Sequence, residues 1–178
     1  MKKTKPEPLP VELVDVVDQE DRPLAVMPLT EAIRQSLYYR LVSVLVFRPD
    51  GKLFLQKRGP KKNLYPNRFD VSASGHVKAG EARVDAASRE LFEELGLRAQ
   101  NLTVLHTVPG SDQTSRAFVT LFSAGRISEP PHPNPQEVAG GMFVDLGELT
   151  ALARDYRDML TPGLVYFFEQ KVLFPNQI

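Results

Sequence analysis

The sequence predicts an α/β protein of the α+β type, with a mixed β-sheet between α-helices. The chain has 178 residues, of which 42% are hydrophobic and 25% charged, a composition that suits one domain with a sizeable core. Short β-branched apolar runs, typical of strands, are interspersed with stretches that have helical spacing. These elements follow no repeating strand–helix–strand order, which favours a mixed sheet over a parallel doubly wound one.

The N-terminal third predicts two strands, a short helix and a hairpin. Residues 1–10 are polar and rich in proline and are predicted to be a flexible tail, so that residues 11–178 form a single domain. Residues 11–28 predict two strands joined by the polar turn "DQEDRP". "LTEAIRQSL" predicts a short helix with Thr30 as its N-cap. "LVSVLVF" predicts a buried strand, which the turn "PDG" connects to the returning strand "KLFLQKR".

The rest of the chain predicts further strands with helices between and after them. "GPKKNLYPNRFD" is a basic loop that leads into the short strand "VSAS". "LTVLHTV" and "RAFVTLFSAG" predict strands, and the proline-rich "ISEPPHPNPQEVAGG" predicts a long loop. "GMFVDLGEL" predicts a strand that runs into a helix, and "GLVYFFEQKVL" predicts a C-terminal helix.

Composition excludes several classes of function. Lys and Arg together number 22, as do Asp and Glu, so no global charge attracts nucleic acid, and no nucleic-acid partner is expected. There is no cysteine, which excludes disulfides, thiolate metal sites and cysteine nucleophiles. No apolar run is long enough to span a membrane, and no signal-peptide pattern is present, so we expect a cytoplasmic protein.

Residues 81–95 predict a helix with one apolar stripe and a neighbouring acidic face. The stripe comprises Val84, Ala87, Leu91 and Leu95, which follow one another at spacings of three or four residues. Glu90, Glu93 and Glu94 have the same spacings and therefore share a face. Gly96 stands where a left-handed C-cap is expected, and Leu97 can fold back onto the last turn.

Three clustered carboxylates repel one another unless a cation neutralises them. Ligands that are all oxygen suit Mg²⁺ or Mn²⁺, which also polarise phosphoryl oxygens and activate bound water. The alternative from the residues alone is a solvated helix face with i,i+4 ion pairs, such as Asp85 with Arg89 or Arg89 with Glu93.

The residues around this helix fill every fixed position of a known signature. Residues 75–97 have the spacings of a Nudix box, whose fixed positions are Gly75, Glu81, Arg89-Glu90-Leu91, Glu93-Glu94 and Gly96-Leu97. The chain therefore resembles the Nudix hydrolase family. The resemblance implies the Nudix fold, an α/β/α sandwich. It also implies Mg²⁺-dependent cleavage of a diphosphate linkage in a small organic molecule.

The resemblance also assigns roles to individual residues. It implies a metal site made of Glu90, Glu93, Glu94 and the backbone carbonyl of Ser74. Glu90 is the first choice for the base that activates water, and Arg89 would orient it. Glu81 would brace the loop or serve an outer metal position, while Gly75 and Gly96 are structural. Some family members carry the base on a later loop, where Glu137 is the candidate here; the alternative for Glu137 is an exposed loop acid.

The basic loop before the box predicts a diphosphate-binding surface. Its candidates are Arg58, Lys61, Lys62 and Arg68, because Arg binds phosphate bidentately and Lys acts as a point charge. These cations alternatively keep an exposed sheet edge soluble. Tyr65 in the same loop either stacks on a base or covers the core.

Residues 11–150 are similar to the isopentenyl-diphosphate isomerase-like branch of the family. The isomerases use a cysteine, a tryptophan and a histidine-rich metal site. Here Ser74 takes the cysteine position, tryptophan is absent, and Tyr39 replaces one of the histidines. The glutamates expected on a later strand are Ser115 and Ala117. His76 does match a metal histidine, but we expect it to lie near the substrate. Serine is a poor proton-transfer group, so hydrolysis is favoured over isomerisation.

A second alternative is a sensor that binds a nucleotide or metabolite without turnover. Family members of that kind carry broken boxes, whereas this box is complete. The expected substrate is a nucleoside diphosphate derivative or a related organic diphosphate. Its identity, the number of metal ions and the oligomeric state, monomer or homodimer, stay open.

Overall fold

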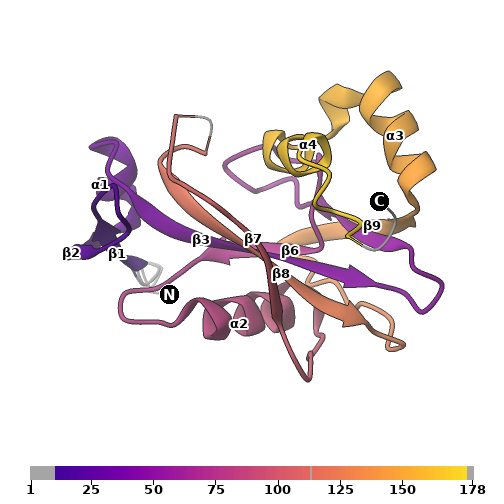
Figure 1. Ribbon diagram of the computed structural model, residues 1–178, viewed down its shortest axis with the longest axis horizontal. Coiled ribbons are helices and arrows are strands. Elements are labelled where there is room, and N and C mark those ends of the chain that lie inside the picture. The colour runs from indigo at the N-terminus through magenta and orange to yellow at the C-terminus, as the bar shows by residue number, and fades with distance from the viewer. Residues whose placement is uncertain (1–10, 113, 176–178) are drawn as a thin grey trace, which may run out of the picture.

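A computed structural model describes residues 11–112 and 114–175 of the chain, so the predicted tail at residues 1–10 lies outside the described part. That part contains nine β-strands, which form two sheets, and four α-helices. Figure 1 shows α2 on one side of the main sheet and α3 and α4 on the other. This is the mixed sheet between helices that the sequence predicts.

The N-terminal segment forms a separate antiparallel hairpin followed by a short helix. β1 (Leu13–Val17) pairs with β2 (Pro23–Pro28), and α1 (Leu29–Arg34) follows directly. The predicted N-cap, Thr30, is wrong: Pro28 occupies that position without a side-chain bond. The helix begins earlier because β2 runs into it, and the first helical N–H, that of Leu29, is already bonded to the carbonyl of Glu12 at 2.9 Å.

The main sheet has seven strands of mixed direction. They are β3 (Tyr39–Phe47), β4 (Leu53–Arg58), β5 (Phe69–Asp70), β6 (Ala73–His76), β7 (Thr103–Val108), β8 (Ala117–Arg126) and β9 (Val138–Val144). β3 and β8 are parallel, whereas the other pairings are antiparallel. Each predicted strand is present, but β6 begins at Ala73 instead of Val71, and β5 lies at the end of the segment predicted to be a basic loop. The proline-rich loop is predicted over residues 127–141, but it ends before Val138, where β9 begins.

The hairpin strands β3 and β4 separate soon after their turn. They pair only at Phe47 and Leu53; beyond that point β6 pairs with β3 and β5 pairs with β4. The fully buried Ser72 joins the two strands where they diverge. Its hydroxyl donates to the carbonyl of Phe54 at 2.6 Å and accepts from the N–H of Val46 at 2.9 Å. This opening brings β6, and with it the start of the box, beneath α2.

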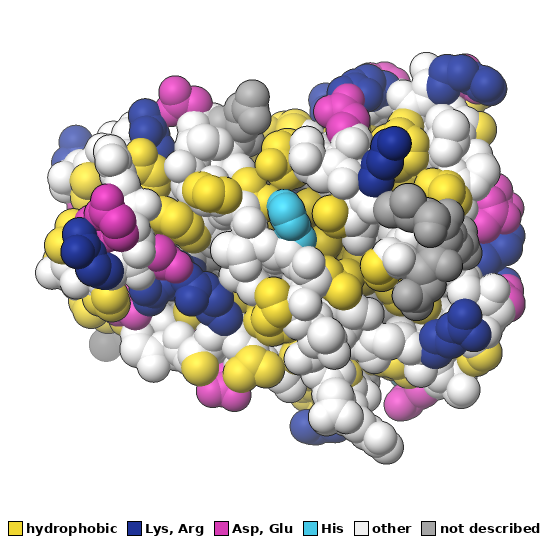
Figure 2. Space-filling view, in the orientation of Figure 1, with side chains coloured by type: hydrophobic (Ala, Val, Ile, Leu, Met, Phe, Trp, Pro, Cys, Tyr) yellow, Lys and Arg dark blue, Asp and Glu magenta, His cyan; other side chains and the backbone are white. Residues whose placement is uncertain are grey.

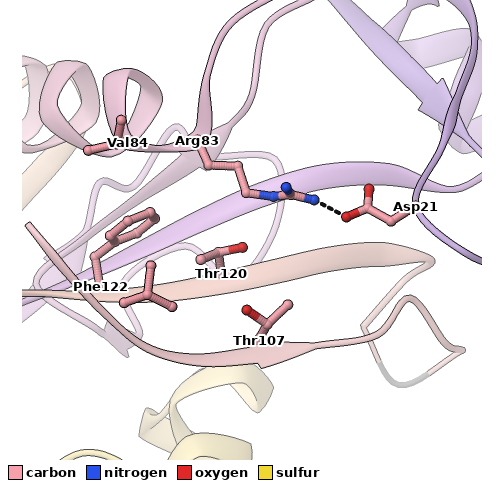
Figure 3. Close-up of a pocket in the computed structure, with 7 residues that line it drawn as sticks. Asp21, Arg83, Val84, Thr107, Thr120 and Phe122 are labelled. Atoms are coloured by element: carbon pink, nitrogen blue, oxygen red, sulfur yellow. Dashed lines mark hydrogen bonds and ion pairs between the residues drawn. The ribbon is translucent and has the colours of Figure 1, made fainter.

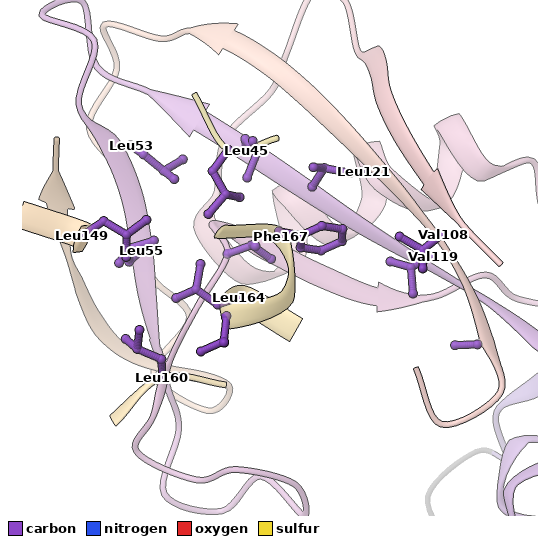
Figure 4. Close-up of a cluster of buried hydrophobic side chains, with 14 of the residues drawn as sticks. Leu45, Leu53, Leu55, Val108, Val119, Leu121, Leu149, Leu160, Leu164 and Phe167 are labelled. Atoms are coloured by element: carbon purple, nitrogen blue, oxygen red, sulfur yellow. The ribbon is translucent and has the colours of Figure 1, made fainter. Parts of the chain in front are cut away.

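Two hydrophobic cores hold the helices against the sheet. On one face, α2 (Arg83–Leu95) packs on β3 and β6 through the buried Ala87, Leu91 and Leu95. On the other face, α3 (Leu146–Asp155) and α4 (Pro162–Glu169) contribute to a larger cluster that includes Leu45, Leu55, Leu164 and Phe167 (Figure 4). A 3₁₀ turn at Arg157–Met159 connects these two helices. Burial of apolar surface on both faces fixes the sandwich.

The details of α2 agree with its predicted pattern in all but one position. Gly96 has φ +66° and caps the helix, its N–H bonding the carbonyl of Phe92 at 2.9 Å, and Leu97 is buried behind it. Val84 was predicted in the apolar stripe, and this is wrong because it is 46% exposed. It lies in the first turn, at the border of a cavity over β7 and β8 rather than in the core.

The surface over β7 and β8 is poor in charge. Figure 2 shows charged side chains gathered toward the two ends of this face, with mainly hydrophobic and uncharged side chains between them. Among the described residues, no helix is both long and apolar enough to cross a membrane.

Candidate active site

Helix α2 packs tightly against strand β6 at Gly75. A Cβ built at this glycine would lie 2.0 Å from the carboxyl carbon of Glu90. No side chain tolerates that contact, so only glycine allows the Glu90 carboxylate to rest on β6. The first glycine of the box therefore positions a carboxylate, which explains why a small residue is needed there.

Glu94 lies deeper than any other acid of the box. Its side chain is buried, with 0% of the residue exposed. Oε2 accepts hydrogen bonds from Gln56 Nε2 at 2.8 Å and from the N–H of Ser74 at 2.9 Å. Oε1 has no hydrogen-bond partner among the described residues, and the nearest cation is Lys62 Nζ at 3.5 Å. Burial raises the pKa of Glu94 because the charged form loses its hydration.

Arg89 organises the acids on the other side of the cluster. Its guanidinium binds both carboxylate oxygens of Glu81, at 2.8 and 2.9 Å. It also donates to Glu90 Oε1 at 2.5 Å, to Glu93 Oε2 at 3.3 Å and to the carbonyl of His76 at 3.0 Å. The arginine thus fixes the loop before α2 and two of the predicted metal ligands together.

Glu90 keeps a raised pKa in spite of this arginine. Burial raises the pKa of the Glu90 carboxyl to about 7, and the nearby Glu93 and Glu94 charges add to the effect, while Arg89 opposes it. A carboxyl group that titrates near neutral pH is suited to general base catalysis. Strongly perturbed acids of this kind cluster at functional sites.

Glu137 comes to the same cluster from the loop before β9. Lys62 Nζ contacts Glu137 Oε2 at 2.7 Å and also faces Glu94. The loop is docked on the C-terminal end of α2, because the N–H of Asn134 bonds the carbonyl of Glu94 at 2.9 Å. Two candidate bases, Glu90 and Glu137, therefore flank the buried Glu94.

The residues of this cluster fit a hard divalent cation by their chemistry. In the described part of the chain, no three His, Asp or Glu side chains converge as ready metal ligands, since Arg89 and Lys62 hold the acids instead. The donors are nevertheless all oxygen, as Mg²⁺ and Mn²⁺ prefer. One of them, Glu94 Oε1, is buried without a hydrogen bond, which is costly unless a cation neutralises it.

The predicted phosphate-binding cations are not all placed alike. Arg58 is engaged within its own loop, donating to the carbonyl of Leu64 at 3.0 Å and to Asp70 at 3.2 Å. Arg68 donates to the carbonyl of Leu160 at 3.3 Å and lies against the Tyr65 ring. Lys61 is exposed, and Lys62 faces the acids. Tyr65 is 40% exposed and so does not cover the core.

His76 belongs to β6 but lies apart from the carboxylates. Gly75 faces α2, because a Cβ built on it would point at Glu90. Successive side chains of a strand point to opposite faces, so the His76 side chain faces away from α2. Its Nδ1 lies 3.3 Å from Glu12 Oε1, and its ring packs against Tyr39. Its carbonyl, rather than its imidazole, touches the cluster, through Arg89. Substrate binding by His76 stays a prediction.

Sequence reasoning missed Gln56, which orients Glu94. Gln56 is fully buried on β4 and reaches Glu94 across the opening between β3 and β4. The available signal was a lone amide inside the apolar strand "KLFLQKR". A buried polar side chain needs a partner, but the sequence does not say which one.

A separate cavity lies over β7 and β8, beside the N-terminal turn of α2. Its volume is about 340 Å³, and its walls include Thr107, Thr120 and Phe122 from the sheet (Figure 3). Above them Arg83 of α2 reaches Asp21 of the β1–β2 turn. This cavity contains none of the predicted site residues.

Comparison with known proteins agrees with this geometry. The NUDIX domain family matches residues 37–161. An uncharacterized Nudix hydrolase of Pseudomonas aeruginosa is 35% identical over 134 residues, which cover 75% of this chain and 78% of that protein. An isopentenyl-diphosphate Delta-isomerase of Photorhabdus laumondii is 29% identical over 84% of this chain and 86% of its own.

A solved structure shows the same fold. A crystal structure from Deinococcus radiodurans has a TM-score of 0.79 and 25% identity, covering 89% of this chain and 98% of that one. The family model and the Pseudomonas relative, which is named a Nudix hydrolase, support the hydrolysis of phosphorus anhydrides on small molecules, whereas the Photorhabdus relative is named an isomerase. The chain belongs to the Nudix family and is a Nudix hydrolase.

Proposed function

We propose that this enzyme hydrolyses the diphosphate linkage of a nucleoside diphosphate derivative or a related organic diphosphate, with Mg²⁺ or Mn²⁺ as cofactor. Glu90, Glu93, Glu94 and the carbonyl of Ser74 would hold the ion. The observation that carries this proposal is the state of Glu94. It is a fully buried carboxylate with one oxygen that makes no hydrogen bond among the described residues, directly beside the Glu90 carboxylate on Gly75.

The charge balance of the cluster supports a cationic ligand. Five carboxylates share two cations there: Arg89 pairs with three of them and Lys62 with two, the acids being Glu81, Glu90, Glu93, Glu94 and Glu137. Burial of an uncompensated charge costs several kcal/mol, and a bound divalent ion would offset that cost. A bound ion would supply charge for the phosphoryl oxygens and lower the pKa of a water molecule.

The chain's own residues would position the reactants. Phosphoryl transfer depends mainly on positioning and electrostatic stabilisation. Arg89 fixes Glu90 and Glu93 relative to Glu81, and Gln56 and the Ser74 N–H fix Glu94. Lys62 faces the same cluster and is the predicted phosphate-binding cation nearest to the acids.

The base is proposed to be Glu90, with Glu137 as the alternative. Burial gives Glu90 a pKa of about 7, which matches a base that works near neutral pH. Glu137 is more exposed and is paired with Lys62. We expect Glu90→Gln to lower kcat by at least ~10²-fold, the scale of general base catalysis, and Glu137→Gln to lower it less than tenfold. The reverse order would assign the base to Glu137.

The test of the proposed function is turnover by a Glu94→Gln variant. A panel of nucleoside diphosphate derivatives and other organic diphosphates, with Mg²⁺ or Mn²⁺, identifies the best substrate from released monophosphate. Glu94→Gln keeps the hydrogen-bonding shape but removes the charge, and we expect kcat to fall by about 10³-fold. Asp21→Asn, a matched loss of a partly buried carboxylate outside the cluster, should retain kcat within about twofold. Near-normal turnover by Glu94→Gln would contradict the proposal.

Isomerisation of a five-carbon diphosphate is the second candidate, because a named isomerase is among the relatives. The chain has no cysteine, and the positions expected to hold glutamates carry Ser115, in a loop, and Ala117, buried on β8. Incubation with isopentenyl diphosphate in D₂O separates the two reactions. Incorporated deuterium without released phosphate would establish the isomerase; we expect no incorporation.

A further inference from the structure

Lys62 makes two contacts that no role in phosphate binding requires. Its ammonium lies 2.7 Å from Glu137 Oε2 and 3.5 Å from Glu94 Oε1. These acids come from distant parts of the chain, one from α2 and one from the loop before β9. Its contact with Glu94 is purely one of charge, since Oε1 makes no hydrogen bond among the described residues.

The loop that carries Lys62 is built to hold it there. The N–H of Gly59 bonds the carbonyl of Glu137 at 2.7 Å, and a Cβ at Gly59 would lie 2.8 Å from that oxygen. The N–H of Lys62 then closes a turn on the carbonyl of Gly59 at 3.2 Å. Further along, Arg58 holds the carbonyl of Leu64. The loop is therefore anchored on both sides of Lys62, while its neighbour Lys61 points into solvent.

A cation at this place competes with any other cation that binds Glu94 Oε1. Two unit charges about 4 Å apart interact with roughly 1 kcal/mol even at the dielectric constant of water, and with more in a partly buried site. An ammonium beside a divalent ion is therefore repelled, whereas an ammonium beside an unoccupied carboxylate stabilises it. Lys62 has a flexible side chain and a second acid, Glu137, to which it can remain bound.

We infer that Lys62 is a positioning residue that neutralises Glu94 before the metal ion binds and competes with the ion for Glu94 Oε1. On this account the ammonium shifts its interaction to Glu137 and the substrate diphosphate once the ion is present. The inference rests on the proposed function, because it requires a divalent cation at Glu94. The Lys62 ammonium would then be an exchangeable counter-ion that belongs to the site.

The test is a calorimetric titration of the chelator-treated protein with MnCl₂. We expect Lys62→Met to bind Mn²⁺ about tenfold more tightly than the wild type, because a repelling charge is gone. Lys62→Arg keeps the charge and should bind as the wild type does. Lys61→Met, the matched loss of a neighbouring lysine, should change the Kd less than twofold. A gain in affinity is the opposite of what damage to the site would cause.

Thermal unfolding supplies a second readout that needs no activity. Without metal, Lys62→Met should unfold at a Tm about 3 °C lower than the wild type, because Glu94 loses its counter-ion. With saturating MnCl₂ the difference should close, since the variant gains more from the ion. Equal or weaker Mn²⁺ binding by Lys62→Met, with normal binding by the wild type, overturns this inference alone. No Mn²⁺ binding by the wild type would overturn the metal site and this inference together.

Discussion

Helix α2 borders two charged clusters that differ in charge balance, a balanced flank at the cavity and an acidic flank at Gly75. On the flank beside the cavity, Arg83 pairs with Asp21, and Arg40 pairs with Asp21 at 2.7 Å and with Asp15 at 3.6 Å. Two arginines thus meet two aspartates, and the charges balance. On the flank beside Gly75, five glutamates meet one arginine and one lysine. The same helix therefore borders a neutral cluster at its first residue, Arg83, and an acidic cluster further along, around Glu90 and Glu94.

This difference in charge balance distinguishes the two clusters by their need for a cation. The network of Arg40, Arg83, Asp15 and Asp21 has equal numbers of positive and negative charges, so it carries no net charge that would attract a cation. An unbalanced and partly buried cluster has a free-energy cost that the fold alone does not recover. Such sites usually serve binding or catalysis, and here the acidic flank is the one that the Nudix box builds.

The strongest way to break the acidic flank is Gly75→Ala. The added methyl group would overlap the Glu90 carboxylate at 2.0 Å, so α2 or Glu90 must move. We expect kcat to fall by roughly 10²- to 10³-fold, as displacements near 1 Å do in catalytic sites. Gly80→Ala is the control: its Cβ meets nothing within 4 Å, and the cost is only that of φ +73°. Equal activities of the two variants would show that the close approach is unimportant.

Arg89→Met should have the next largest effect. It removes the contacts to Glu81, Glu90 and Glu93 at once and leaves three acids without their shared cation. We expect a roughly 30- to 100-fold loss in kcat/KM and a lower Tm. Arg83→Met removes an arginine from the other flank of the same helix and serves as the matched control, with activity retained. An active Arg89→Met enzyme would mean that the acids position themselves.

The acidic flank should also make the metal-free protein less stable as pH rises. Burial raises the pKa of Glu90 from 4.5 to about 7 and also raises that of Glu94. The folded state then binds more protons than the unfolded state, so this contribution is present below pH 4.5 and is lost as pH rises through about 7. With chelator at pH 8, Glu90→Gln should therefore be more stable than the wild type by ~2 kcal/mol.

Urea unfolding at pH 4.5 and pH 8 measures this difference directly. At pH 4.5 the gain from Glu90→Gln should be much smaller than at pH 8, because Glu90 is then largely protonated in the folded state. A gain that does not depend on pH would show that Glu90 is not held in a raised-pKa environment.

The balanced flank should respond least. Asp21→Asn leaves Arg40 and Arg83 without their shared carboxylate, and we expect a loss of about 1–2 kcal/mol in unfolding free energy. Activity at a temperature well below Tm should stay within about twofold of the wild type. A large loss of activity in a folded Asp21→Asn protein would remove the distinction between the two flanks.

The sequence could predict the acidic flank because its residues are close together in the chain. The spacing of Glu90, Glu93 and Glu94 gave the shared face, and Gly96 gave the end of the helix. The sheet and its helices followed from apolar periodicity. These are local signals, in which the period of the backbone translates directly into position.

Contacts between distant segments could not be predicted in this way. Gln56 reaches Glu94 only because β3 and β4 separate, and Ser72 holds them where they do. Arg83 meets Asp21 across 62 positions of the chain, which no periodicity records. Arg58, which is predicted to bind phosphate, also pairs with Asp70 and with the carbonyl of Leu64, and the sequence did not predict these contacts. Helical spacing therefore predicts which acids share a face, whereas the cations that contact them depend on the topology of the chain.

The most direct test of this account is Mn²⁺ binding by Glu94→Gln and Asp21→Asn, measured by calorimetry on chelator-treated protein. Each substitution removes one carboxylate charge beside α2, Asp21 from the balanced cluster and Glu94 from the acidic one. We predict that Asp21→Asn binds Mn²⁺ as the wild type does, whereas Glu94→Gln loses at least ~30-fold in affinity. Equal binding by the two variants would contradict the assignment of the metal site to the acidic flank.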